Sequence, residues 1–254
     1  MKGLKSAAVP LAAILAFLAF WEALVWVNDW PNYKMASPSD LPPAFWKYRW
    51  FFLEMSWQTL WRTVAGLGLA VVVGTLLGMA MGFSRVARDA LYPLLVGFNA
   101  IPKATLVPVI ALIFIGQHDF NTVLMAFLIS FFPIAVSVGI GLSTLEPEYR
   151  DILRALGASK VTIFWKIALP KTLPEFFGAL KVSATLAFIG TNLVEIVSPH
   201  GRGLGALFKS GETNGDYPLM FAVLIALAAL GILLYYAVVF LERIFAGWAE
   251  RPAH

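Results

Sequence analysis

The 254-residue sequence contains no cysteine, which excludes a disulfide framework and any thiolate-based catalysis or metal binding. Charged residues are also scarce. Asp, Glu, Lys and Arg make up 13% of the chain, about half of the roughly 25% that is usual in soluble domains. A chain with so few charges cannot cover a water-exposed surface, so a soluble globular protein is excluded. The three histidines, His118, His200 and His254, are far apart and form no His-Glu-x-x-His motif, so we expect no metal site.

Long apolar runs are the main feature that is present. Hydrophobic residues make up 59% of the chain, and the mean hydropathy is +0.77. A helix that crosses a bilayer needs about 20 mostly apolar residues. Six runs are long enough, at residues 9–27, 59–83, 91–115, 122–142, 176–197 and 219–245. We therefore predict an all-α membrane protein in which residues 1–254 form one domain of six transmembrane helices, the third kinked at Pro102 and Pro108.

Lys and Arg between the apolar runs indicate how the chain is oriented. They are more frequent in the segments on the same side as the N-terminus, which the positive-inside rule assigns to the cytoplasm. We therefore expect a multi-pass membrane protein with both termini in the cytoplasm. Segment 28–57 then lies on the outer side of the membrane. Its aromatic residues at 45–52 suit a helix at the bilayer surface or, as an alternative, a contact for an outside partner.

Small residues recur at every fourth position of the second run. They are Gly66, Ala70, Gly74, Gly78 and Gly82. On a helix this spacing places them on one face, where a neighbouring backbone can approach closely. We interpret the series as a helix-packing face and not as a phosphate-binding loop.

The polar segment 143–175 separates the fourth and fifth runs, and its sequence predicts two short helices. The first is expected to end at Gly157, because glycine readily takes the left-handed conformation that terminates a helix. Ser159 is suited to cap the second helix, which we expect to stop at Pro170. A helix, a turn and a helix would form a rigid projection from the membrane domain.

The spacing within this segment carries a family resemblance. Gly157 is followed, after nine residues, by Ile167-Ala-Leu169-Pro170, and this is similar to the Glu-Ala-Ala-x3-Gly-x9-Ile-x-Leu-Pro loop of ABC importer permeases. Asp151 stands where that family has Glu, and Ile-Leu replaces its two Ala. Further matches follow the family order at Thr59-Leu-Trp-Arg62, Ile101-Pro102-Lys103, Leu193-Val-Glu195 and Gly203-Leu-Gly205. The sequence thus resembles the permeases of nitrate, sulfonate, taurine and pyrimidine-precursor importers.

This resemblance implies the type I ABC importer permease fold, with a cytoplasmic coupling helix between the fourth and fifth spans. It also implies a location in the bacterial inner membrane, with segment 28–57 on the periplasmic side. The permease would form a homodimer that works with two ATPase subunits and a periplasmic or lipid-anchored solute-binding protein. ATP and magnesium would bind the partner ATPase. The chain itself would bind no cofactor, catalyse no reaction, and contact membrane lipid but no nucleic acid. The residues implied to dock the ATPase are Asp151, Arg154, Ala155, Leu156, Gly157, Ala158, Ser159, Phe164, Ile167, Leu169 and Pro170.

Lys103 lies within the third apolar run, directly after Pro102. A charge at membrane depth costs about 2.5–3.5 kcal/mol on insertion scales and indicates a functional role by default. Lys103, together with Asn99 one turn earlier, would suit a path for an anionic solute. Lys103 would equally suit binding to the backbone carbonyls that a proline break leaves free, and the sequence leaves both interpretations open.

Acidic and basic residues also lie near the outer ends of three runs. Glu22, Arg62 and Glu195 are expected at the same level, with Asn192 one turn inward of Glu195. They predict either an ion pair that fixes the geometry of the bundle or an outer gate on the translocation path. The spacing does not distinguish between the two.

Two other classes of protein compete with the importer permease. A secondary transporter or channel that works without an ATPase would often show internal repeats, and none is evident here. An intramembrane enzyme would need paired catalytic groups at membrane depth, which Lys103 alone does not supply. The transported solute is not specified by the sequence beyond a small, anionic or pyrimidine-precursor class.

Overall fold

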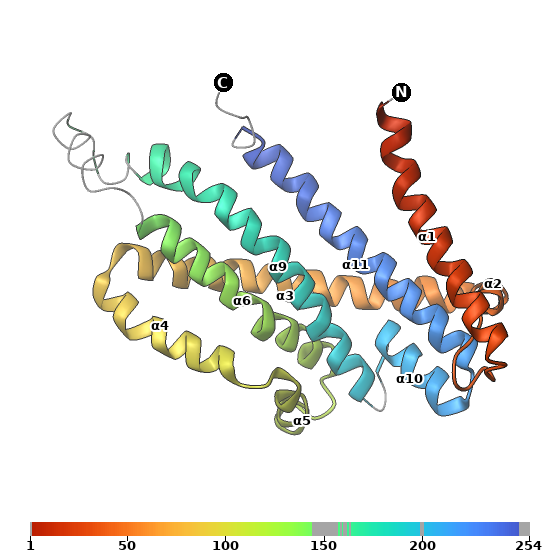
Figure 1. Cartoon of the computed structure of the whole chain (residues 1–254). Helices are drawn as coiled ribbons and strands as arrows, with labels where there is room; N and C mark the ends of the chain where they lie inside the picture. The colour runs from red at the N-terminus through yellow and green to blue at the C-terminus, as the bar shows by residue number, and fades with distance from the viewer. Residues whose placement is uncertain are drawn as a thin grey trace.

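The computed structural model describes residues 2–143, 157, 159, 162, 164–198 and 201–248. Within these ranges the chain is helical, with no strand (Figure 1). The helices are α1 (Lys2–Val27), η1 (Pro38–Asp40), α2 (Leu41–Lys47), α3 (Arg49–Phe83), α4 (Arg85–Ala100), α5 (Lys103–Ile113), α6 (His118–Ser143), η2 (Phe164–Ala168), α9 (Leu169–Val197), α10 (Leu204–Asn214) and α11 (Tyr217–Ala246). We call the end of the bundle that carries the connection from α6 to α9 the loop end, and the opposite end the α10 end.

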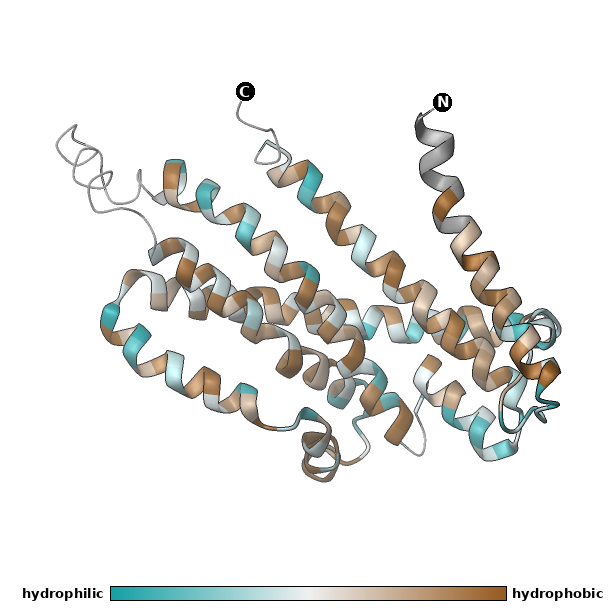
Figure 2. Cartoon of the chain, viewed as in Figure 1, coloured by the Kyte–Doolittle hydropathy of each residue, from teal (hydrophilic) through white to brown (hydrophobic). Residues whose placement is uncertain are grey.

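Four of these helices are long and apolar enough to cross a membrane. They cover Arg49–Phe83, His118–Ser143, Trp165–Val197 and Tyr217–Ala246, and apolar residues run along them (Figure 2). The pair α4 and α5 makes a fifth span if the two are counted together. The described apolar part of α1, Ala12–Val27, is shorter. The structure thus supports four to five spans, and the sixth stays a prediction.

The centre of the bundle is formed by α3, α6 and α9, and small residues bring these helices together. The glycines of α3 lie against α6: a Cβ on Gly74 would come within 2.8 Å of the Phe131 carbonyl oxygen. A Cβ on Gly78 would come within 2.7 Å of the Ala135 carbonyl oxygen. Ala70, one turn before Gly74, is fully buried. Gly66, Gly74 and Gly78 therefore lie at a backbone-to-backbone contact, and Gly82 lies against the Leu142 side chain, so larger side chains do not fit at these positions.

The second helix begins earlier than the sequence indicates. It starts at Arg49 and not near residue 59, and it follows α2 after the single residue Tyr48. The aromatic residues at 45–52 are thus shared between α2 and the first turn of α3. Hydropathy marks the part of a helix that lies in the bilayer, while the backbone hydrogen bonds continue beyond it.

A polar contact fastens α2 to the start of α11. The Tyr48 hydroxyl donates to Asp216 Oδ2 over 2.6 Å, and the Leu219 N–H donates to Asp216 Oδ1 over 3.2 Å. Lys47 Nζ lies 3.6 Å from Asp216 Oδ2. Partial burial opposes ionisation of Asp216, but the two hydrogen bonds and the Lys47 charge outweigh it and lower its pKa below the usual value.

The predicted third span is broken and not merely kinked. Helix α4 ends at Ala100, α5 begins at Lys103, and the two axes differ by 92°. Pro102 has no N–H to continue the helix and forces Ile101 into an extended conformation. Pro108 lies inside α5 without ending it, so the kink expected at Pro108 stays a prediction.

Candidate functional site

A buried polar cluster lies at the α10 end, where α3, α6, α9 and α10 meet. Its centre is Arg62 on α3, whose side chain is 1% exposed, and Glu195 on α9, whose side chain is 0% exposed. Arg62 Nη1 lies 3.3 Å from Glu195 Oε1. Arg62 also donates through Nη2 to Asp119 Oδ1 of α6 over 2.6 Å, and through Nη1 to the carbonyl oxygen of Arg202. One guanidinium therefore links two other long helices and the connection before α10.

Glu195 holds the start of α10 in place. Its carboxylate accepts hydrogen bonds from the Thr59 hydroxyl over 2.8 Å and from the Gly205 N–H over 3.1 Å. The Thr59 oxygen in turn accepts the Leu204 N–H over 2.8 Å. Gly203 has a φ of +128°, and a Cβ there would overlap the Glu195 carboxyl group. The Glu195 carboxylate and the Thr59 hydroxyl thus each accept one N–H at the beginning of α10, where such groups lack partners within the helix.

Glu22 does not belong to this cluster, although it was expected beside Arg62. Its carboxylate accepts the Ser39 N–H over 3.0 Å and the Ser39 hydroxyl over 2.8 Å. Helix α1 packs with η1, α2 and the adjacent part of α11, so Glu22 meets the segment that follows its own helix. Asn192 lies one turn from Glu195, and its amide donates to the Phe188 carbonyl of the same helix over 2.7 Å.

Asp119 and His118 complete the cluster and are absent from the residues predicted from the sequence. Asp119 is 61% exposed at its side chain, and His118 Nδ1 lies 3.2 Å from Ser198 Oγ. Both residues help to line an open cavity of about 620 Å³ that also contains Arg62, Gln58 and Arg202. The sequence signal that could have found Asp119 is Arg62 itself. An arginine has five N–H donors, so a buried Arg62 requires acceptors besides Glu195.

Lys103 lies at the break between α4 and α5, where it binds backbone oxygens. Its Nζ donates to the carbonyls of Phe98, Asn99 and Ile101 over 2.7, 3.0 and 3.2 Å. Phe98 and Asn99 lie in the last turn of α4 and Ile101 directly follows it, so these carbonyls lack the N–H four residues ahead that a continuing helix would supply. Two interpretations of Lys103 were left open, a path for an anionic solute and binding to backbone carbonyls at the proline break. The observed hydrogen bonds are those of the second interpretation. The Asn99 side chain is exposed.

The break lies about halfway along the bundle. The Phe98 ring, near the end of α4, packs against Phe131 with 5.7 Å between ring centroids, and Phe131 is near the middle of α6. Helix α5 then crosses α6 and α9, where Val107 and Ile110 pack in one cluster with Met125, Ile129 and Val194. The non-helical residues 101–102 are therefore remote from both ends of the long helices.

Part of the predicted docking segment at the loop end lies within the described residues. Gly157 has a φ of +83°, as a helix-ending turn requires. The Ser159 hydroxyl accepts the Thr162 N–H over 3.1 Å, which is the geometry of a helix cap. Asp151, Arg154, Ala155, Leu156 and Ala158 lie outside the described residues, and so does any helix ending at Leu156.

The second predicted helix does not stop at Pro170. Phe164–Ala168 form a π-helical turn that passes into α9 without interruption, and Pro170 lies in the first turn of α9. A proline is tolerated there because the N–H groups of a first turn lack intrahelical acceptors. Ile167 and Leu169 lie on either side of this junction and are partly buried. Trp165 is 62% exposed.

No group of three or more His, Asp or Glu side chains in the described part of the chain is arranged to hold a metal ion. The geometry of the cluster at the α10 end is thus that of ion pairs and helix caps. Its components come from helices that are distant in sequence and meet only in the folded bundle.

Comparison with known proteins shows the family of the chain. Residues 70–247 match the model of the family described as binding-protein-dependent transport system inner membrane component. The chain is 31% identical to the formylaminopyrimidine transport permease protein ThiX of Halalkalibacterium halodurans, over 99% of this chain and 100% of that protein. It is 25% identical to the bicarbonate transport system permease protein CmpB of a Synechocystis species, over 93% of this chain and 88% of the relative.

The fold is likewise similar to that of a solved structure. A chain of the MetNI methionine ABC transporter, in an inward-facing conformation, matches with a TM-score of 0.62 and 21% identity. The match covers 78% of this chain and 98% of that chain. With the apolar helices and the family match, these likenesses establish that the chain belongs to the family of binding-protein-dependent transport system inner membrane components, as a membrane-spanning permease subunit of an ABC importer.

Proposed function

We propose that two copies of this chain form the translocation path of an ATP-driven importer, with the loop end in the cytoplasm. A solute-binding protein would deliver a small solute at the α10 end, and two ATPase subunits would dock on segment 143–175. The observation that carries the proposal is the broken helix pair α4 and α5, which has non-helical backbone at mid-bundle depth and polar residues beside it.

The chemistry of the bilayer supports a path along this break. Non-helical backbone within the hydrocarbon core is tolerated only where it is buried in protein or lines a water-filled cavity. Asn99, Pro102 and Thr105 are exposed in the single chain, and Lys103 is half-buried. The acyl chains of lipids cannot form hydrogen bonds with the polar groups of this surface. It therefore faces either the second permease subunit or water between the subunits, and both place it at the centre of the assembly.

The docking proposal is supported by the rigid geometry next to segment 143–175. The turn at Gly157, the Ser159 cap and the π-helical turn Phe164–Ala168 lead directly into α9. A partner that moves this projection would move a long helix of the bundle core with it. ATP binding and hydrolysis then act on the path only through the different stability of its two conformations.

The solute class follows from the relatives and from Lys103 together. The relatives are named for formylaminopyrimidine and bicarbonate, so a small anion or a pyrimidine-type solute is the class we propose. Lys103 gives its hydrogen bonds to three carbonyls, so its role would be to hold the break and leave a positive charge beside the path. The binding protein would make most of the selection.

A labelling experiment tests the path directly, because the native chain is free of cysteine. Asn99→Cys should react with a membrane-impermeant maleimide when the chain is assembled with its ATPase in proteoliposomes, and the rate should change when ATP is added. Ile232→Cys, an exposed position midway along α11, is the matched control and should stay unreactive. Equal rates at both positions would refute a water-filled path at Asn99. Solute uptake without the ATPase would favour a secondary transporter.

A further inference from the structure

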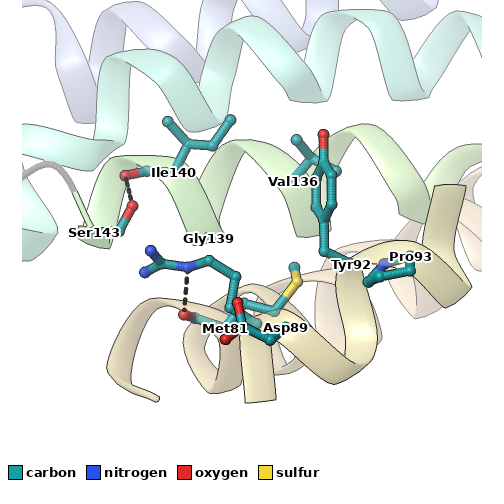
Figure 3. A pocket seen from close by; sticks show the side chains of 9 residues that line it. Met81, Asp89, Tyr92, Pro93, Val136, Gly139, Ile140 and Ser143 are labelled. Atoms are coloured by element: carbon teal, nitrogen blue, oxygen red, sulfur yellow. Dashed lines mark hydrogen bonds between the residues drawn. The ribbon is translucent and has the colours of Figure 1, made fainter. Parts of the chain in front are cut away.

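A cavity of about 450 Å³ opens between α4 and α6 near the loop end. It is distinct from the break at Ile101–Pro102 and from the polar cluster at the α10 end. Its wall includes Arg88, Asp89 and Tyr92 of α4 and Val136, Ile140 and Ser143 of α6 (Figure 3). The cavity exists because α4 diverges from the bundle after Ser84. Among the residues of α4, Leu95 is the one that is buried.

Polar and apolar groups are separated along the length of this cavity. Arg88 and Asp89 lie in the first turns of α4, and Ser143 is the last residue of α6, so charge and hydroxyl groups gather at the loop end. Deeper in the bundle, the Tyr92 ring extends from α4 toward Val136 of α6 (Figure 3). This order matches an amphiphile that lies parallel to the helices, with its head at the membrane surface and its chain inside.

Arg88 and Asp89 lie at the mouth of the cavity and keep polar atoms that can bind a ligand. Arg88 Nε donates to the Met81 carbonyl at the end of α3 over 3.2 Å, which fixes the guanidinium. In the part of the chain that the structure describes, neither of its terminal nitrogens has a partner. Asp89 likewise forms no ion pair there. A guanidinium binds a phosphate through two parallel hydrogen bonds, and a neighbouring carboxylate suits a primary ammonium group.

We propose that this cavity binds a phospholipid with an ethanolamine headgroup. The phosphate would lie on Arg88, the ammonium group on Asp89, and an acyl chain along Tyr92, Val136 and Ile140. A single-sign anionic headgroup would meet the Asp89 charge without compensation, so the zwitterion is the better match. With the orientation proposed above, the lipid belongs to the cytoplasmic leaflet. Its presence would fill the space between the first turns of α4 and the end of α6.

Native mass spectrometry of the full chain in mild detergent tests this site. Phosphatidylethanolamine, phosphatidylglycerol and phosphatidylcholine would each be titrated into delipidated protein. Wild type should retain phosphatidylethanolamine, Arg88→Gln should retain at least fivefold less, and Arg88→Lys should fall between them. Arg85→Gln is the matched control, since Arg85 is one turn away on the same helix, exposed and outside the cavity. This readout does not depend on membrane orientation or on the ATPase.

Two more variants distinguish the lipid from other occupants. Asp89→Asn should shift the preference toward phosphatidylglycerol, because it removes the charge that repels an anionic head. Val136→Phe should lower lipid retention by filling the cavity while leaving Arg88 and Asp89 intact, and it serves if Arg88→Gln does not fold. Equal losses in Arg88→Gln and Arg85→Gln would overturn the proposal. So would displacement of the lipid by glycerophosphoethanolamine at similar concentration, or Tyr92→Cys cross-linking between two copies with no lipid retained.

Discussion

Removing the Arg62 side chain should destabilise the α10 end of the bundle more than any exposed arginine does. Arg62→Met keeps the length and apolar stem of the side chain but leaves Glu195 buried without its ion-pair partner. Breaking a buried pair in this way costs about 3–5 kcal/mol. Glu195 would keep the hydrogen bonds from Thr59 and Gly205, so we expect about 3 kcal/mol, near the lower limit of that range. Asp119 is mostly exposed and would be solvated by water.

The change can be followed by the intrinsic fluorescence of the chain. For a protein of this size, 1 kcal/mol corresponds to about 2–4 °C in Tm, so Arg62→Met should lower the apparent Tm by roughly 6–12 °C at a fixed scan rate. Arg49→Met is the control, because Arg49 is on the same helix but its side chain is exposed. It should shift the Tm by about 2 °C or less.

A double variant separates the ion pair from general damage to packing. In Arg62→Met with Glu195→Leu, both charges are replaced by apolar groups, and such replacements are often neutral for buried pairs. The double variant should therefore recover more than half of the Tm lost in Arg62→Met. If the two single losses simply add, Arg62 and Glu195 are not coupled and the reasoning is refuted.

Three further predictions concern the helix contact, the docking turn and the α2–α11 contact. Gly78→Val should destabilise the chain by about 1–3 kcal/mol through overpacking, whereas Gly68→Val should be near neutral because open space surrounds it; equal Tm losses would contradict this. Gly157→Val strains a residue at φ +83° and should abolish co-purification of the ATPase, while Gly215→Val, at φ +71° on the opposite end, should not; retained ATPase in the first variant would oppose docking at this turn. The pKa of Asp216 is lowered in the folded chain, so its ionised form stabilises the fold at neutral pH. That stabilisation is lost as the pH falls through the folded pKa, so the Tm difference between wild type and Asp216→Asn should close below about pH 4; a constant difference would contradict the assignment.

The sequence predicts the helices well and their ends less well. The central part of each membrane helix is specified by apolar residues, which is a local property and can be read directly. The start of α3 and the break between α4 and α5 depend on hydrogen bonds and angles that hydropathy does not record. Pro102 and Pro108 look alike in the sequence, yet the first breaks the chain by 92° and the second lies within a helix. The difference lies in which carbonyls can be satisfied by neighbours such as Lys103.

The sequence predicted only part of the candidate site, because contacts between helices are not a local property of the sequence. Arg62 and Glu195 were expected together, and the structure places them 3.3 Å apart. Glu22 was assigned to the same level by counting residues, but the level of a residue along a helix does not specify which neighbour it faces. Asp119 was missed because it lies in the first turn of α6, which hydropathy assigns to the connection before the apolar run. Side chains that pair from different helices can be predicted only when the packing of the bundle is known.

The continuity of the helix from Trp165 to Val197 has a mechanical consequence. Its 33 residues make a stiff rod of about 50 Å at 1.5 Å per residue. A tilt of about 5° at one extremity would displace the other by roughly 4 Å, which exceeds the 3.3 Å that separates Arg62 Nη1 from Glu195 Oε1. Glu195 lies near the C-terminal end of this helix. A small tilt of the helix, applied at Trp165, would therefore be enough to move the Glu195 carboxylate away from the Arg62 guanidinium and to release the start of α10.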